Sequence, residues 1–197
     1  KSLGRIKHGI VAANVGDSGM MHYKKSRSGN AEIDRAVTHV LKSSGKPHGV
    51  IDFSPYGYDE RQFCSPGINL AVGSLTRTPY GRYPEYHTSG DDLSLVKPEY
   101  LADSFMTYLA VIQVLEQNRC FLNLNPKCEP QLGRRGLYRL LGGNVESNEV
   151  ELAMLWVLNL SDGDHALLDI AERAGMKFER IAEAAELLCR NELLKAC

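Results

Sequence analysis

The stretch NAEIDRAVTHVLKSSGKPHGVIDF, residues 30–53, decides the predicted fold. Apolar side chains recur at helical spacing within residues 33–41 and form one stripe of an amphipathic helix. Residues 43–47 (SSGKP) end this helix, and residues 49–53 (GVIDF) form a short apolar strand. A further apolar strand is predicted ahead of the helix, at residues 9–15 (GIVAANV).

This strand–helix–strand order indicates a βαβ unit, and such crossovers predict a parallel sheet with helices on its faces. A third strand is predicted at residues 68–76 and a long helix at about residues 98–118. The fold class is therefore α/β, with a parallel or mixed sheet and flanking helices. Lys24, Lys25 and Arg27 are expected in a solvated loop between the first strand and the first helix. The core-facing side of the long helix is expected to comprise Leu101, Phe105, Tyr108, Leu109, Ile112 and Leu115.

The composition is that of an ordinary soluble protein, with 43% hydrophobic and 24% charged residues and a net charge of -1. This charge gives no general attraction to nucleic acid or to an anionic membrane. No apolar run approaches the roughly 20 residues that span a bilayer. The five cysteines are odd in number and form no CxxC pair, which favours free thiols in a reducing, cytoplasmic environment.

The loop that leaves the strand at residues 49–53 is rich in Gly, Pro and Tyr and extends from Tyr56 to Asp92. In open α/β proteins ligands bind at this carboxyl edge of the sheet. The acidic cluster 59–60 begins the loop, and His87 with a carboxylate at Asp91 lies near its end. A histidine with a nearby carboxylate is typical of a metal ligand and its supporting partner. The alternative is a salt-bridged loop with a surface histidine.

Residues 119–145 contain several Gly and Pro turns and are interpreted as a surface linker, so one domain is predicted at 1–145 and a second at 146–197. The second domain contains predicted helices at about 149–159, 165–174 and 177–191, an order typical of a small winged helix-turn-helix module. From Glu151 to Cys197 there are nine acidic and five Lys or Arg residues. An acidic surface repels phosphate, so we expect no nucleic-acid binding and favour a docking or structural role.

Three motifs resemble the zinc-dependent exopeptidase family that includes bacterial aminopeptidases and glutaminyl cyclases. Tyr58 to Phe63 (YDERQF) resembles the family's Ser-Asp-His-x-x-Phe turn, and residues 66–68 (PGI) resemble its Gly-Ile-Pro strand. Residues 86–91 (YHTSGD) resemble its Tyr-His-Thr-x-x-Asp motif. The segments GYDERQFCSPGINL, PEYHTSGDD and CEPQLGRRGLY, with the helix-turn-helix, resemble bacterial proteins that have an aminopeptidase-like domain and whose genes often lie near polysaccharide-biosynthesis genes.

The resemblance implies roles for six residues. His87 matches the last metal ligand, and Asp17 is the nearest candidate for an acidic metal ligand at a strand end. Asp91 matches the acid that orients the motif loop or its imidazole, and Asp59 matches an acid that supports the site by hydrogen bonds. Glu60 replaces the family's common histidine. Arg61 completes the cluster that would shape the pocket and contact substrate charges.

The family's His-bearing motif, bridging Asp and general-base Glu all precede the segment present here. The chain also starts without Met and runs early into an apolar strand. We therefore interpret it as the C-terminal half of a catalytic domain plus its helical module, inactive alone. The intact protein is predicted to be a metallohydrolase that uses one or two Zn²⁺ ions to cleave a peptide or other amide, without a membrane and with a homo-oligomer left open. The alternative function is that of a non-catalytic interaction or regulatory protein that docks through the acidic helix-turn-helix.

Overall fold

A computed structural model describes residues 3–137 and 145–197. The chain forms two compact units, Lys1–Leu115 and Glu116–Cys197. The two units therefore divide at residues 115/116, before the boundary at 145/146 that composition suggested. The reason is that residues 119–145, interpreted as a linker, contain a strand, β5, that pairs within the second unit. The end of that stretch, residues 138–144, lies outside the described residues.

The first unit contains a mixed four-stranded sheet of order β1-β4-β2-β3. Its strands are β1 (Gly9–Ala12), β2 (Met21–Lys24), β3 (His48–Ile51) and β4 (Val72–Thr76). β1 is parallel to β4 and β2 is parallel to β3, whereas β2 and β4 run antiparallel. The expectation of an α/β unit with a parallel or mixed sheet is confirmed in this form.

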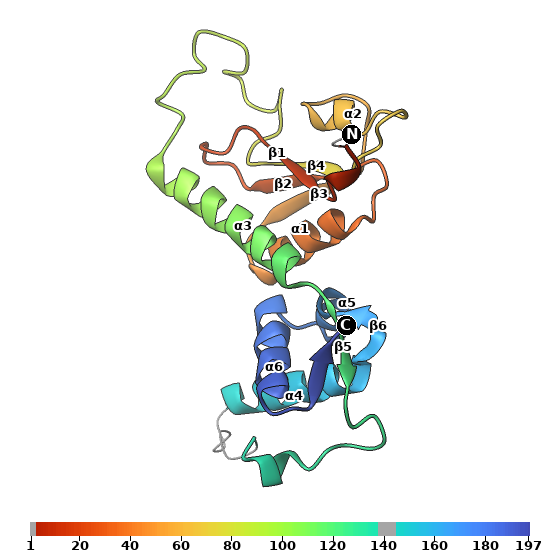
Figure 1. The fold of residues 1–197 in the computed structure, drawn as a ribbon. Helices are drawn as coiled ribbons and strands as arrows, with labels where there is room; N and C mark the ends of the chain where they lie inside the picture. Colours follow the sequence, from red (N-terminus) through yellow and green to blue (C-terminus); the bar gives the residue numbers. More distant parts are fainter. Residues whose placement is uncertain (1–2, 138–144) are drawn as a thin grey trace. The chain divides into compact units, whose positions relative to one another are not determined.

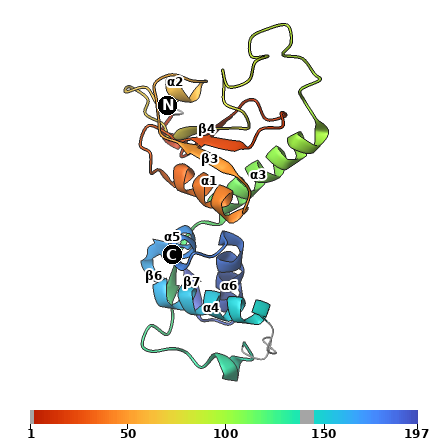
Figure 2. The ribbon, with the colours of Figure 1, turned by 180° about the vertical axis from the view of Figure 1, so that it is seen from behind.

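Helices lie on both faces of the sheet (Figure 1). α1 (Glu32–Ser43) and α3 (Pro98–Gln117) lie on one face, and the single-turn α2 (Glu60–Phe63) lies on the other. The view from behind in Figure 2 shows the same arrangement. A short 3₁₀ helix at Leu3–Arg5 precedes β1.

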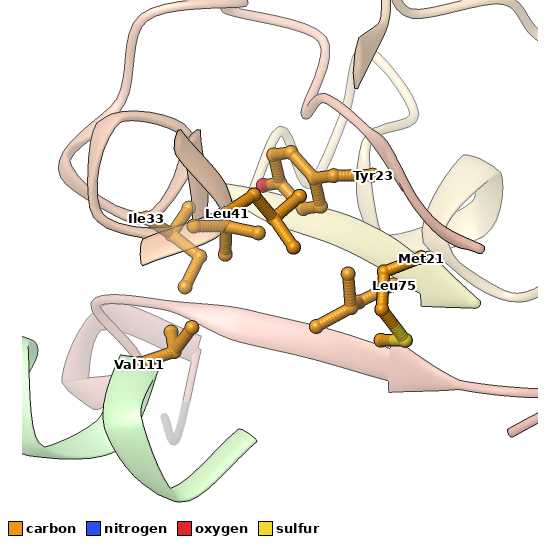
Figure 3. Close-up of a cluster of buried hydrophobic side chains, with 7 residues drawn as sticks. Met21, Tyr23, Ile33, Leu41, Leu75 and Val111 are labelled. Carbon is orange, nitrogen blue, oxygen red and sulfur yellow. The ribbon is translucent and has the colours of Figure 1, made fainter. Parts of the chain in front are cut away.

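The core of this unit lies between the sheet and the helices α1 and α3. Its buried side chains come from β2, α1, β4 and α3 (Figure 3). They are Met21, Tyr23, Ile33, Val37, Leu41, Leu75 and Val111. The predicted stripe of α1 therefore does face the core.

The crossover in the sheet differs from the predicted one. α1 connects β2 to β3, and these two strands are adjacent and parallel, whereas β1 pairs with β4. The prediction that the basic segment 24–27 forms a solvated loop was wrong at Lys24, which ends β2 and is 7% exposed. Two of the four residues of β2 are polar and face the less apolar side of the sheet, so no apolar run revealed the strand.

The prediction of which residues of α3 face the core was also partly wrong. Its most buried residues are Ser104, Val111 and Val114, whereas Phe105 and Ile112 are exposed. The helix is apolar on several sides, so the sequence did not define which stripe faces the sheet. The hydroxyl of Ser104 donates to the carbonyl of Val15, which fixes the observed orientation.

One buried carboxylate connects β2 to α1. Asp34 accepts hydrogen bonds from the Tyr23 hydroxyl at 2.8 Å, from the Ser26 amide at 2.7 Å and from the Ser26 hydroxyl at 2.6 Å. The amide of Ala31 at the start of α1 is a fourth donor, at 2.9 Å. Burial, followed by the neighbouring Asp34, raises the pKa of Tyr23, so its hydroxyl remains a donor at neutral pH.

In its described residues, the second unit combines a small antiparallel sheet with three α-helices. The strands are β5 (Cys120–Asn123), β6 (Asp162–Ala166) and β7 (Leu194–Ala196), in the order β6-β5-β7. The helices are α4 (Val145–Leu160), α5 (Leu167–Ala174) and α6 (Phe178–Arg190), and a 3₁₀ turn spans Leu132–Arg135.

The turn between α5 and α6 uses Gly175, whose φ of 65° lies in the left-handed region that favours glycine. The sequence predicted the three helices but not β6, because residues 162–166 contain three polar residues that resemble a helix cap. Within residues 3–137 and 145–197, no helix is both long and apolar enough to cross a membrane.

We predict that Tyr23→Phe lowers the free energy of unfolding of the chain by about 1–3 kcal/mol, because it removes one donor from a buried carboxylate. Urea unfolding monitored by circular dichroism would measure this change. Tyr100→Phe is the matched control, since the Tyr100 hydroxyl makes no hydrogen bond within the described residues, and it should change stability much less. Equal effects of the two substitutions would contradict the role assigned to Asp34.

Candidate functional site

Alternation along the central strands gives the sheet two chemically different faces. Met21 and Tyr23 of β2 face the apolar core, so His22 and Lys24 face the side that carries α2. β4 behaves in the same way, because Leu75 is in the core and Ser74 faces the opposite side. The antiparallel register places Lys24 directly across from Ser74.

A buried ion pair lies on this second face. Glu60, the first residue of α2, is fully buried, and its Oε1 accepts a hydrogen bond from Lys24 Nζ at 2.9 Å. Lys24 Nζ also donates to the Tyr56 carbonyl at 2.5 Å. Gly57 is needed here, because a Cβ at this position would lie 2.2 Å from Glu60 Oε1. The loop that follows β3 thus packs closely around the carboxylate of Glu60.

A cavity of about 220 Å³ opens beside this ion pair, and we call it the Glu60 cavity. Side chains of β2, β4, α2 and the two tyrosine-containing loops line it. Those with polar groups include His22, Lys24, Tyr58, Glu60, Ser74 and Arg82. Two buried polar atoms of this lining, Glu60 Oε2 and Ser74 Oγ, have no hydrogen-bond partner within the described residues.

Tyrosine rings bring the segments 56–60 and 80–91 together. Tyr80 packs edge-on against Tyr56 and Tyr58, with ring centroids 5.4 Å and 5.3 Å apart. Tyr83 packs edge-on against Tyr86 at 5.5 Å. The contacts of Tyr80 join the start of the predicted site loop to its later part.

Two of these tyrosines are held in the neutral form. Burial raises the pKa of Tyr58 above its ordinary value, with smaller effects from Tyr86 and Tyr83. Burial and the hydrogen bond that its hydroxyl donates to Asp91 raise the pKa of Tyr83 to about 12. Both hydroxyls are therefore donors at neutral pH and cannot act as general bases there.

His87 lies on the surface of the loop. Its imidazole stacks on the ring of Tyr86, with centroids 4.0 Å apart and an interplanar angle of 14°. Its φ of 58° lies in the left-handed region, which is uncommon for a residue other than glycine and is enriched at functional sites. Asp91, four residues later, accepts the Tyr83 hydroxyl at 3.2 Å. The loop thus presents an exposed imidazole whose backbone and neighbours are fixed.

Asp17 supports the same region from the loop after β1. Its Oδ1 accepts hydrogen bonds from the Gly19 amide at 2.7 Å and from the Thr78 hydroxyl, and its Oδ2 accepts the Thr78 amide at 3.3 Å. Asn14, with φ of 46°, donates to the Tyr58 hydroxyl at 2.8 Å and to the Thr78 carbonyl at 3.2 Å. Both side chains connect the β1 loop to the segment that follows β4.

The six candidate residues therefore occupy different environments. Glu60 is buried beside the cavity, whereas Asp59 and Arg61 on either side of it are exposed and do not line the cavity. His87 and Asp91 share the loop after Tyr83, and Asp17 lies in the loop after β1. Within the described ranges, no three His, Cys, Asp or Glu side chains converge in a way that could hold a metal ion.

Sequence reasoning missed three polar groups of this site: Lys24, Ser74 and Asn14. Lys24 and Ser74 became neighbours only through the antiparallel pairing of β2 with β4, which no local pattern encodes. Asn14 carries a weak signal, because asparagine tolerates a positive φ and follows the apolar run that forms β1.

Comparison with known proteins follows the two structural units. Residues 1–118 match a family described as "Domain of unknown function (DUF4910)", and residues 119–196 match a winged helix-turn-helix family. The first match covers more than half of the chain. The chain belongs to the DUF4910 family. The expected winged helix-turn-helix after the α/β unit is confirmed as a family assignment, and it begins at residue 119.

Two relatives from Clostridium acetobutylicum extend this DUF4910 assignment. One is 56% identical over 193 residues. It carries the provisional name of a polysaccharide biosynthesis protein with an aminopeptidase-like domain. The other is a crystal structure at 2.37 Å, described provisionally as a peptidase, with a TM-score of 0.90 and 53% identity. The matches cover 98% and 99% of this chain but 44% and 43% of the relatives. The chain thus spans less than half the length of either relative.

We predict that Lys24→Met lowers the free energy of unfolding by about 3–5 kcal/mol, because Glu60 is left buried without its cation. Thermal and urea unfolding of purified variants would test this. Lys25→Met is the matched control, since Lys25 pairs at 3.1 Å with Asp52, which is largely exposed, and should cost less than about 1 kcal/mol. The double variant Lys24→Met/Glu60→Leu should recover much of the loss. A Lys24 variant as stable as the Lys25 variant would contradict the importance of the buried pair.

Proposed function

We propose that the protein to which this chain belongs is a zinc-dependent, aminopeptidase-like hydrolase of a peptide or other amide bond, and that this chain carries part of the active site. The observation that carries the proposal is the loop of Tyr83 to Asp91. It presents the exposed imidazole of His87 on a constrained backbone, beside a hydrogen-bonded tyrosine and carboxylate. The provisional names of the two relatives support the same class of activity.

The donors of this chain fit a zinc site only in part. The exposed imidazole of His87 is a common zinc ligand, but a catalytic Zn²⁺ ion takes about three protein ligands and a water molecule. The remaining ligands and the general base would come from another part of the protein, since the matched relatives are more than twice as long as their aligned portion. When bound, Zn²⁺ would polarise the scissile carbonyl and lower the pKa of bound water to roughly 7.

The carboxylates of Asp91 and Asp17 suit supporting roles. Asp91 accepts the Tyr83 hydroxyl and would fix the loop that carries the imidazole. Asp17 already accepts three hydrogen bonds from Gly19 and Thr78, so it fits a metal less well than His87 does. Its proposed role is to position the segment after β4 rather than to bind zinc directly.

The remaining polar groups would bind and orient the substrate. The neutral hydroxyl of Tyr58 can donate to the negative oxygen that develops when an amide carbonyl is attacked, whereas Tyr83 already donates its only hydroxyl proton to Asp91. Asp59 and Arg61 are exposed beside the buried Glu60 and would contact charged groups of the substrate from outside the cavity.

We predict that His87→Asn, made in the natural protein that contains this chain, reduces bound zinc to less than half and lowers amino-terminal peptide hydrolysis by about 100-fold or more. Asp91→Asn should weaken zinc binding by about 10–100-fold. Elemental analysis and release of amino acids from short peptides would measure both effects.

His48→Asn is the matched control for that experiment. The His48 ring contacts the carbonyl of Lys46, away from the loop, so zinc content and activity should remain unchanged. Wild-type zinc content and activity in the His87 variant would show that this residue does not bind the metal.

A second candidate function is supported by the winged helix-turn-helix match: an interaction or regulatory protein that docks through this unit. The exposed residues of α6 favour a protein partner over nucleic acid. Glu179, Glu183 and Glu186 are exposed on this helix. Arg180 is paired with Glu183 at 3.2 Å and Arg190 with Glu186 at 2.6 Å. The cations of α6 are thus partly neutralised by its own carboxylates, which leaves little counterion release to drive DNA binding.

We predict that the chain does not bind duplex DNA selectively. Fluorescence anisotropy at low salt, with a set of unrelated duplexes, should show only weak signals that do not saturate. Replacing Glu179, Glu183 and Glu186 together by Gln should increase nonselective, salt-sensitive binding, because it removes the charges that repel phosphate. Tight, sequence-selective binding by the unaltered chain would overturn the protein-docking interpretation.

A further inference from the structure

We propose that the Glu60 cavity is a binding site for a compact hydroxy-carboxylate, which donates its hydroxyl to Glu60 Oε2 and directs its carboxylate toward Arg82. The proposal concerns this cavity alone and does not depend on the hydrolase proposal. It is carried by two buried polar atoms that have no hydrogen-bond partner in the described part of the chain, by the size of the cavity and by the charges around it.

The two polar atoms have hydrogen-bonding capacity that the described residues leave unused. Glu60 is fully buried and Ser74 is 3% exposed, yet Glu60 Oε2 and Ser74 Oγ have no partner within the described residues. Leaving such groups without hydrogen bonds is costly, and folded proteins rarely do so. Both residues line the same cavity, and in the proposed complex the ligand hydroxyl would lie within reach of both atoms.

The ion pair defines what the ligand must offer. Lys24 Nζ donates to Glu60 Oε1 at 2.9 Å, which orients the carboxylate and leaves Oε2 as an acceptor. A ligand must therefore present an O–H or N–H group at this end. Ser74 lies across from Lys24 in the sheet register, and its hydroxyl can either donate or accept.

The size and the walls of the cavity limit the rest of the ligand. The volume of about 220 Å³ is below the roughly 300–1,000 Å³ of sites for drug-sized molecules, so the ligand is small. Ile51, Pro79 and the rings of Tyr58 and Tyr80 supply apolar walls. These walls favour a short carbon skeleton between the polar ends.

The surrounding charges favour a neutral donor and an anionic outer end. Lys24 and Glu60 neutralise each other, so an ammonium group on the ligand would add a second cation close to Lys24. Arg82 is exposed on the cavity lining, and its guanidinium forms no ion pair with a carboxylate within the described residues. A guanidinium binds a carboxylate well in this position.

Titration of the ¹⁵N-labelled chain with three probes tests the proposal. Lactate offers a hydroxyl and a carboxylate, propionate lacks the hydroxyl, and alanine replaces it with an ammonium group. We expect lactate to shift the amide signals of residues 22–24, 58–60 and 74–76 saturably, with propionate and alanine at least about tenfold weaker. Equal binding of lactate and propionate, tighter binding of alanine, or no saturable shift with any probe would each overturn the proposal.

Single substitutions connect that binding to the named atoms. Ser74→Ala removes a hydroxyl that has no partner among residues 3–137 and 145–197, so the melting temperature should be unchanged or higher while lactate binds about tenfold more weakly. Arg82→Gln should also weaken lactate binding, and Arg5→Gln, at an exposed arginine outside the cavity, should not. Because Glu60→Gln breaks the buried ion pair and can unfold the chain, the Ser74 variant is the decisive one. Lactate binding unaffected by Ser74→Ala and Arg82→Gln would show that the site lies elsewhere.

Discussion

Four hydrogen-bond donors surround the buried carboxylate of Asp34, and the arrangement of the first unit depends on this interaction. One donor comes from β2, two come from Ser26 just after it, and one comes from the start of α1. The carboxylate thereby fixes both the position of α1 on the sheet and the direction in which Tyr23 points. Since side chains alternate along a strand, Lys24 must then point to the opposite face. The position of Lys24 in the candidate site thus depends on hydrogen bonds made in the core.

The sheet separates two kinds of environment. On the side of α1 and α3, apolar packing contributes most, with a buried Tyr23 and Leu75 (Figure 3). On the side of α2, a charged pair and several hydroxyls surround a cavity. Burying the Lys24–Glu60 pair has a desolvation cost that its attraction offsets only in good geometry. The close approach of Gly57 to Glu60 shows how tightly the backbone encloses this pair.

The sequence predicted those features that depend on local patterns. The stripe within residues 33–41 gave α1, and the apolar runs located β1, β3 and β4, while the Gly175 turn indicated the helix pair α5 and α6. Features that depend on contacts distant in sequence were not predicted. β2 is polar at alternate positions, β6 is mostly polar, and β5 is followed by turn residues, so their pairing partners rather than their compositions define them. The site shows the same division, since Glu60 and the tyrosines were found from the loop, but Lys24 and Ser74 meet only in the folded sheet.

The alternation along β2 also bears on how uniquely this sheet is specified. β2 has four residues and pairs on both sides, in parallel with β3 and antiparallel with β4. Backbone hydrogen bonds alone would discriminate poorly between neighbouring registers of so short a strand. A slip of one residue, however, would move Lys24 into the apolar core and Tyr23 away from Asp34. The buried charges and the buried hydroxyl therefore fix the register of β2. These polar groups add little net stability, but they exclude misaligned pairings of the strand.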